Sequence, residues 1–246
     1  MLIRAELIKL TKNKLTYFGI ILSLVPFIIT LLFASGSKSF LLFGKYDLLS
    51  YTNGMFSTVA LGIGIFSIYF SMIINSVISS EINSDMIIYE IIGKSKRKKI
   101  FISKIISLLI FFSIILCLML IFIILGYEFF LRNTEYAIST HDKYELGTFI
   151  YAIIYYYGLI IFISSLSFLG LGNSLVIGSF IENLLIVKLS SIVWLAPYII
   201  GSPMDTNADT YSHNFTQFMS TQYVLLFFAV IVCLFICKHI FESRDF

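Results

Sequence analysis

The sequence has little charge, few cysteines and almost no proline. Only 13% of its 246 residues are Asp, Glu, Lys or Arg, whereas 59% are hydrophobic and the mean hydropathy is +0.95. Average soluble domains carry roughly 25% charged residues, so a soluble globular protein is excluded. The three cysteines lie in apolar runs, which indicates reduced thiols rather than a disulfide framework. We therefore expect a multi-pass protein of the cell (cytoplasmic) membrane.

Catalytic and nucleotide-binding motifs are also missing. The sequence contains no H-E-x-x-H, G-x-S-x-G or C-x-x-C pattern, and its three histidines are scattered over predicted loops and the tail. Gly93-Lys94-Ser95 has the appearance of the end of a phosphate-binding loop, but Ile88 stands where that loop needs glycine. We expect no enzymatic activity, no cofactor and no metal in this chain, and no nucleic-acid partner.

Long apolar runs are abundant. A membrane-spanning helix needs about 20 apolar residues to cross roughly 30 Å of hydrocarbon, and six runs have this length. The predicted fold class is an all-α integral membrane protein with six transmembrane helices in a single domain, 1–246. Pro26 predicts a kink in the first span. The predicted spans are 15–34, 54–80, 100–126, 147–169, 174–194 and 221–238, preceded by an amphipathic interfacial helix over 1–14.

The distribution of positive charge predicts the orientation. With six spans, twelve of the 17 Lys and Arg residues fall in segments on the side of the termini, four fall on the other side, and Lys188 lies within a span. Positive loops are retained on the cytoplasmic side of membranes. Both termini are therefore expected in the cytoplasm.

The most basic run is the hinge over 81–99, between the second and third spans. A segment this charged cannot lie in hydrocarbon, and its sign assigns it to the cytoplasm. Within it, 85–92 can form a short amphipathic helix. Two interpretations remain open: a solvated loop that only fixes orientation, or a docking element on the cytoplasmic surface.

Two ionisable residues, Glu182 and Lys188, lie within the fifth predicted span. Their separation of six residues points them to different faces of a helix, so they do not form an i,i+4 pair. Glu182 either lines a translocation path or lies near the headgroups, and both alternatives remain open. Lys188 can extend its ammonium group toward the interface.

The sequence resembles the permease subunits of type-2 ABC exporters. Within this family it is most similar to the permeases of lantibiotic-immunity, bacitracin-resistance and peptide-toxin export systems. Their hinges often read E-x-E-x-G-T, an apolar patch, then P-x-S-R-x-x-I and a Lys, and their chains begin with E-x-x-K-L. Here Asp85-Met86 stands in place of Gly-Thr, and Lys94 in place of Pro. The residues that match the hinge are Glu81, Ile91, Ile92, Arg97, Ile100 and Lys104, and those that match the start are Glu6, Lys9 and Leu10.

The resemblance implies a membrane subunit of an ATP-driven exporter of amphipathic or hydrophobic substrates, antimicrobial or toxin peptides among them. It also implies a separate cytoplasmic ABC ATPase that binds ATP and Mg, and a second permease copy or a sister permease in the bilayer. The hinge would be the coupling helix that docks to the ATPase. Its expected contact residues are Met86, Ile87, Tyr89, Glu90, Ile91, Ile92 and Arg97.

Two other function classes fit the same composition. An ion- or proton-coupled secondary transporter could use Glu182, although such transporters usually contain inverted repeats, which the two halves of this sequence do not display. A non-transporting scaffold or sensor subunit is the third alternative.

Overall fold

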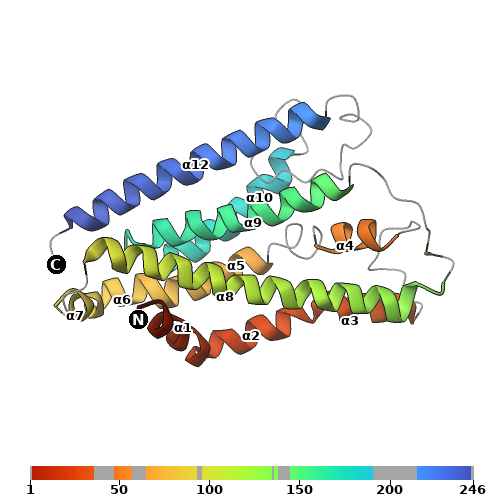
Figure 1. The fold of residues 1–246 in the computed structure, drawn as a ribbon, viewed down its shortest axis with the longest axis horizontal. Coiled ribbons are helices and arrows are strands. Elements are labelled where there is room, and N and C mark those ends of the chain that lie inside the picture. The colour runs from red at the N-terminus through yellow and green to blue at the C-terminus, as the bar shows by residue number, and fades with distance from the viewer. Residues whose placement is uncertain are drawn as a thin grey trace.

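The computed structural model describes residues 2–35, 47–56, 65–92, 96–134, 136–137, 145–190 and 215–244, and within these ranges the secondary structure is helical with no β-strand (Figure 1). The first elements are α1 (Leu2–Lys12), α2 (Lys14–Ser23), α3 (Val25–Ala34), α4 (Leu48–Phe56), α5 (Ile65–Ile74), η2 (Asn75–Ser79), α6 (Ser80–Asn83) and α7 (Met86–Ile92). They are followed by α8 (Arg97–Gly126), η3 (Tyr127–Leu131), α9 (Glu145–Ser167), α10 (Asn173–Ser190) and α12 (Phe215–Ser243).

Five described stretches are long and apolar enough to cross a membrane: Lys14–Ala34, Ile65–Asn83, Arg97–Leu131, Phe149–Ser167 and Ser220–Ser243. The helical character expected from the sequence is therefore confirmed, and five of the six predicted spans have a counterpart among helices that are long and apolar enough to cross a membrane. The fifth predicted span, 174–194, overlaps α10, an 18-residue helix that is not among these five, and its residues 191–194 lie outside the described part.

The boundaries differ most at the second span. Gly54, its predicted first residue, lies in α4, which starts at Leu48 within a predicted loop. The second candidate span begins at Ile65, and residues 57–64 lie outside the described part. In the first span the helix is interrupted at Leu24, two residues before Pro26, as expected because proline donates no backbone hydrogen bond.

The second and third spans each contain a π-helical turn, η2 and η3. Such turns insert an extra residue into the hydrogen-bond ladder and shift the face that the rest of the helix presents. η2 joins α5 to α6, so it sets the direction of the residues that enter the hinge.

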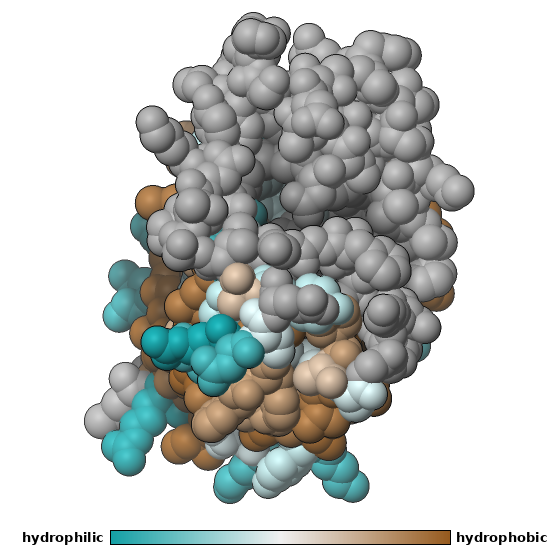
Figure 2. All heavy atoms as spheres, turned by 90° about the vertical axis from the view of Figure 1, so that its right-hand side faces the viewer, coloured by the Kyte–Doolittle hydropathy of each residue, from teal (hydrophilic) through white to brown (hydrophobic). Residues whose placement is uncertain are grey.

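The two described ends of the chain and α7 lie at the same end of the bundle, which we call the hinge end, while α4 and the end of α8 lie toward the opposite end (Figure 1). Figure 2 views that opposite end, where hydrophilic residues stand beside hydrophobic ones on the described surface. The exposed ion pair between Glu128 and Arg132 follows α8 there.

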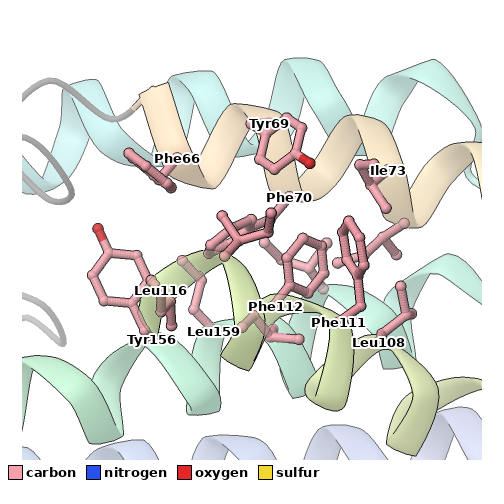
Figure 3. Close-up of a cluster of buried hydrophobic side chains, with 14 of the residues drawn as sticks. Phe66, Tyr69, Phe70, Ile73, Leu108, Phe111, Phe112, Leu116, Tyr156 and Leu159 are labelled. Atoms are coloured by element: carbon pink, nitrogen blue, oxygen red, sulfur yellow. The ribbon is translucent and has the colours of Figure 1, made fainter. Parts of the chain in front are cut away.

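A cluster of aromatic and aliphatic side chains fills the middle of the bundle (Figure 3). The rings of Phe70 on α5 and Phe112 on α8 have centroids 4.2 Å apart, and Tyr156 of α9 meets the edge of Phe70 at 6.0 Å. Lipid tails are as apolar as these side chains, so close van der Waals packing, rather than escape from water, stabilises helix association in a bilayer. This packing holds the second, third and fourth spans together.

Candidate functional site at the hinge end

α7 is a seven-residue helix between the second and third spans, and it divides the residues expected at the hinge into two faces. Ile87 is fully buried and Ile91 packs partly against the core, whereas Met86 and Tyr89 are 55% and 77% exposed. Ile87 and Ile91 are four residues apart, so they lie on the same side of the helix. They attach α7 to the bundle and leave Met86 and Tyr89 facing outward.

Of the other residues expected at the hinge, the structure describes the side chain of Arg97 alone. The side chains of Glu90 and Ile92 lie outside what the structure describes. Arg97 begins α8 and is half-buried; its Nη1 donates to the backbone oxygens of Glu242 and Arg244, both at 2.7 Å. Arginine near a helix C-terminus satisfies carbonyl groups that have no partner within the helix. Arg97 therefore joins the start of α8 to the end of α12.

The break between α6 and α7 occurs at Asp85, whose φ of 56° lies in the left-handed region. Residues with a Cβ avoid this region, and Asp and Asn tolerate it better than most because their short polar side chains bond locally. The Asp85 carbonyl accepts from the Ile88 amide at 3.0 Å, which starts α7. The chain thus turns sharply here and directs α7 away from the axis of the second span.

Four charged residues meet beside the hinge in a closed arrangement that we call the ion ring: Glu6 and Lys9 of α1, Glu81 of α6 and Lys104 of α8. Lys9 Nζ lies 3.2 Å from Glu6 Oε1 and 3.0 Å from Glu81 Oε1. Lys104 Nζ donates to both Glu6 oxygens at 3.2 Å and also to Glu81 Oε2. Each side chain therefore contacts two of opposite charge, and the formal charges of the four sum to zero.

The ion ring is largely shielded from solvent. The Lys104 side chain is 0% exposed, Glu6 3% and Glu81 15%, while Lys9 is 43% exposed. Lys104 lies seven residues into α8, which is about 10 Å along the helix axis at 1.5 Å per residue. A lysine at this depth needs paired carboxylates because an isolated buried ammonium is strongly disfavoured.

The sequence indicated each member of the ion ring only as a match to a loose family pattern, and it did not predict that they meet. The available signal was that two acids and two lysines all lie close to predicted membrane boundaries on the same side. Their sequence separations of up to 98 residues give no local pattern that would pair them.

A polar seam runs along the second span at intervals of four residues. Ser71 Oγ bonds Ser179 Oγ of α10 at 2.5 Å, Asn75 donates to Asn173 at 3.1 Å, and Ser79 donates to the Ser167 carbonyl at 3.1 Å. The seam ends at Asn83, against the turn between α9 and α10. Small polar side chains of the second span are thus used for packing against other helices of the same chain.

The turn between α9 and α10 requires glycine. Gly170 has φ +75°, and a Cβ at this position would stand 2.9 Å from Asn83 Oδ1. Nearby, Phe168 of the turn packs against Phe101 in a tilted arrangement and against Phe241 edge-on, with ring centroids 4.5 and 4.9 Å away. The turn is therefore packed against α6, α8 and α12 at the hinge end.

Glu182 is in α10, three residues after Ser179, and its side chain lies outside what the structure describes. Its role in a translocation path stays a prediction. Among the described residues, no group of three or more His, Cys, Asp or Glu side chains is arranged to hold a metal ion.

Comparisons with protein-family models, with curated proteins and with solved structures give no match to this chain.

Proposed function

We propose that this chain is the membrane-spanning subunit of an ATP-driven exporter, powered by a separate cytoplasmic ATPase that docks on α7. The observation that carries the proposal is the pair of large side chains, Met86 and Tyr89, that α7 exposes at the hinge end. Exposed aromatic and methionine side chains are typical of the centres of protein interfaces. The buried Ile87 fixes the helix that presents them.

Two features of the fold also support the match between this chain and the exporter pattern. Glu6, Lys9, Glu81 and Lys104 were matched to separate parts of the family's pattern, and they come together in one ion ring. Asp85 occupies the position where the pattern has glycine, and its φ of 56° is a conformation that glycine adopts without strain. Two independent features of the fold thus agree with the resemblance.

In this proposal the hinge end faces the cytoplasm, where ATP is available, and the exposed lysines beside α7 agree with that side. When the ATPase binds and hydrolyses ATP, its movement displaces α7. The second and third spans flank α7 in the chain, and they move with it as rigid helices. The proposed substrates are amphipathic or hydrophobic molecules, antimicrobial or toxin peptides among them. A second permease copy or sister permease completes the complex.

The test is purification of the tagged chain from its native membrane in mild detergent, followed by identification of bound ATP-binding proteins and measurement of ATP hydrolysis. We expect an ABC ATPase to be retained by the wild-type chain. The Tyr89→Ser variant should lower its affinity at least tenfold, since truncation of a central interface aromatic costs about 2 kcal/mol or more.

The matched control is Phe129→Ser, because Phe129 is 73% exposed at the opposite end of the bundle. It should retain the ATPase fully. Absence of any ATPase from the wild-type preparation, or equal loss with both variants, would contradict the proposal.

A further inference from the structure

The ion ring has a connectivity that separate ion pairs would not have. Lys104 and Glu81 belong to the two arms of the hinge, α8 and α6, and their direct contact bridges these arms beside α7. Glu6 and Lys9 contact both arms, which ties α1 to the hinge at two points. α1 therefore follows any displacement of the two arms as long as the ion ring stays closed.

α1 is in turn linked to the first span. Asn13 separates α1 from α2, its side chain accepts from the Leu15 amide at 3.0 Å, and its Nδ2 donates to Ser76 Oγ of η2 at 2.8 Å. This is the N-cap arrangement that fixes the start of a helix. The direction in which α2 enters the membrane is thus set by α1 on one side and by the second span on the other.

We propose that Glu6, Lys9, Glu81 and Lys104 are positioning residues that transmit displacement of the hinge to α1 and through it to the first span, Lys14–Ala34. This inference rests on the proposed function for the source of the displacement. It assigns a role to α1, which makes no contribution to the docking surface itself.

The alternation of charge around the ion ring allows a sharp test. Reversal of one adjacent pair, Glu81→Lys with Lys104→Glu, keeps that pair attractive but places like charges at both neighbouring contacts. Reversal of all four residues restores attraction at every contact. A simple ion pair would be restored by the two-residue exchange, whereas a closed ring needs all four.

The first measurement is hydrogen exchange of the α1 amides in the full chain reconstituted in nanodiscs, which needs no ATPase. Lys104→Met should raise exchange roughly a hundredfold, because it removes the buried cation of the ion ring and leaves the two largely buried carboxylates with Lys9, which is 43% exposed, as their one cation within the ring. Lys9→Met opens the ion ring at its most exposed residue, so it should raise α1 exchange less than Lys104→Met does. Lys99→Met, an exposed lysine of the same helix, is the control and should change nothing.

We expect the α1 amides of the two-residue reversal to exchange as fast as those of Lys104→Met. The α1 amides of the four-residue reversal should exchange at close to the wild-type rate. Unchanged α1 exchange in both Lys104→Met and Lys9→Met, or full restoration by the two-residue reversal, would overturn the inference.

The second measurement is coupling in the intact complex with its ATPase. A bimane label at Tyr17→Cys, an exposed position on α2, in a Cys117→Ala background reports movement of the first span. ATP with vanadate should shift its emission in the wild type. In Lys9→Met and Lys104→Met, we expect the complex to keep its ATPase and to hydrolyse ATP, but the bimane emission should not shift. The four-residue reversal should regain the emission shift.

The outcomes of the two proposals are distinguishable. A full shift in Lys9→Met and Lys104→Met would overturn transmission through the ion ring and leave the proposed function standing. Failure of the wild-type chain to retain an ATPase would overturn the proposed function and, with it, the transmission of force, whatever the hydrogen exchange shows.

Discussion

At the scale of single residues, Tyr69 shows how closely the first and second spans approach. Its hydroxyl group is buried and has no hydrogen-bond partner among the described residues, and a Cβ added at Gly19 would stand only 2.0 Å from that oxygen. Gly19 is therefore required by the close approach of α2 to α5. The tyrosine fills this contact with its ring and carries the cost of an unpaired polar group.

We expect Gly19→Ala to destabilise the chain by about 1–3 kcal/mol, since an added methyl group in a filled contact forces the helices apart. Tyr69→Phe should stabilise it by about 1 kcal/mol, because the buried hydroxyl gains nothing from its surroundings. Unfolding of purified protein in mixed micelles of increasing SDS content measures both. A neutral Gly19→Ala would show that α2 and α5 do not pack as described.

Asp85 offers a second prediction at this scale. Asp85→Gly should stabilise the chain by up to about 1 kcal/mol because glycine has no steric penalty at φ 56°. Asp85→Val should destabilise it, since a β-branched side chain is excluded from this region. Thermal denaturation in detergent measures the two shifts, and equal effects of both substitutions would contradict the left-handed turn.

At the scale of elements, the structure changes which residues of α7 should be substituted. The sequence alone predicts Ile91 and Ile92 as contacts of the ATPase. Ile91 packs partly against the core and Ile87 is fully buried, so acidic residues there would damage the fold. Tyr89 and Met86 are the large side chains that α7 exposes.

We expect Ile87→Asp to lower the yield of monodisperse protein sharply, since an unpaired buried carboxylate costs several kcal/mol. Tyr89→Ser should elute like the wild type in size-exclusion chromatography. If Ile87→Asp is also monodisperse, α7 is not anchored through Ile87, and its two faces are assigned incorrectly.

The sequence predicted those elements that a long apolar run or a proline specifies. The third span was placed within three residues of its start because the basic run before Ile100 ends abruptly, and the interruption before Pro26 follows from proline chemistry. α4 was missed because its residues lack a spanning apolar run. The π-turns, the polar seam and the ion ring depend on neighbours distant in sequence, which no local pattern encodes.

At the scale of the whole molecule, docking of an ATPase on α7 requires that the hinge end faces the cytoplasm. Lys98 is exposed beside α7, and Arg132 is 66% exposed near the opposite end. In a Cys117→Ala background, a membrane-impermeant maleimide should label Arg132→Cys in intact cells and Lys98→Cys only in inverted vesicles. The reverse pattern would contradict the orientation derived from the basic residues.

The central claim, that α7 is the docking site of a separate ATPase, is tested most directly by photocrosslinking in living cells. A benzophenone amino acid placed at Tyr89 should form a covalent adduct with an ATP-binding protein, and the same group at Phe129 should not. Adducts at position 89 with lipid alone, or with no ATP-binding protein, would contradict the claim.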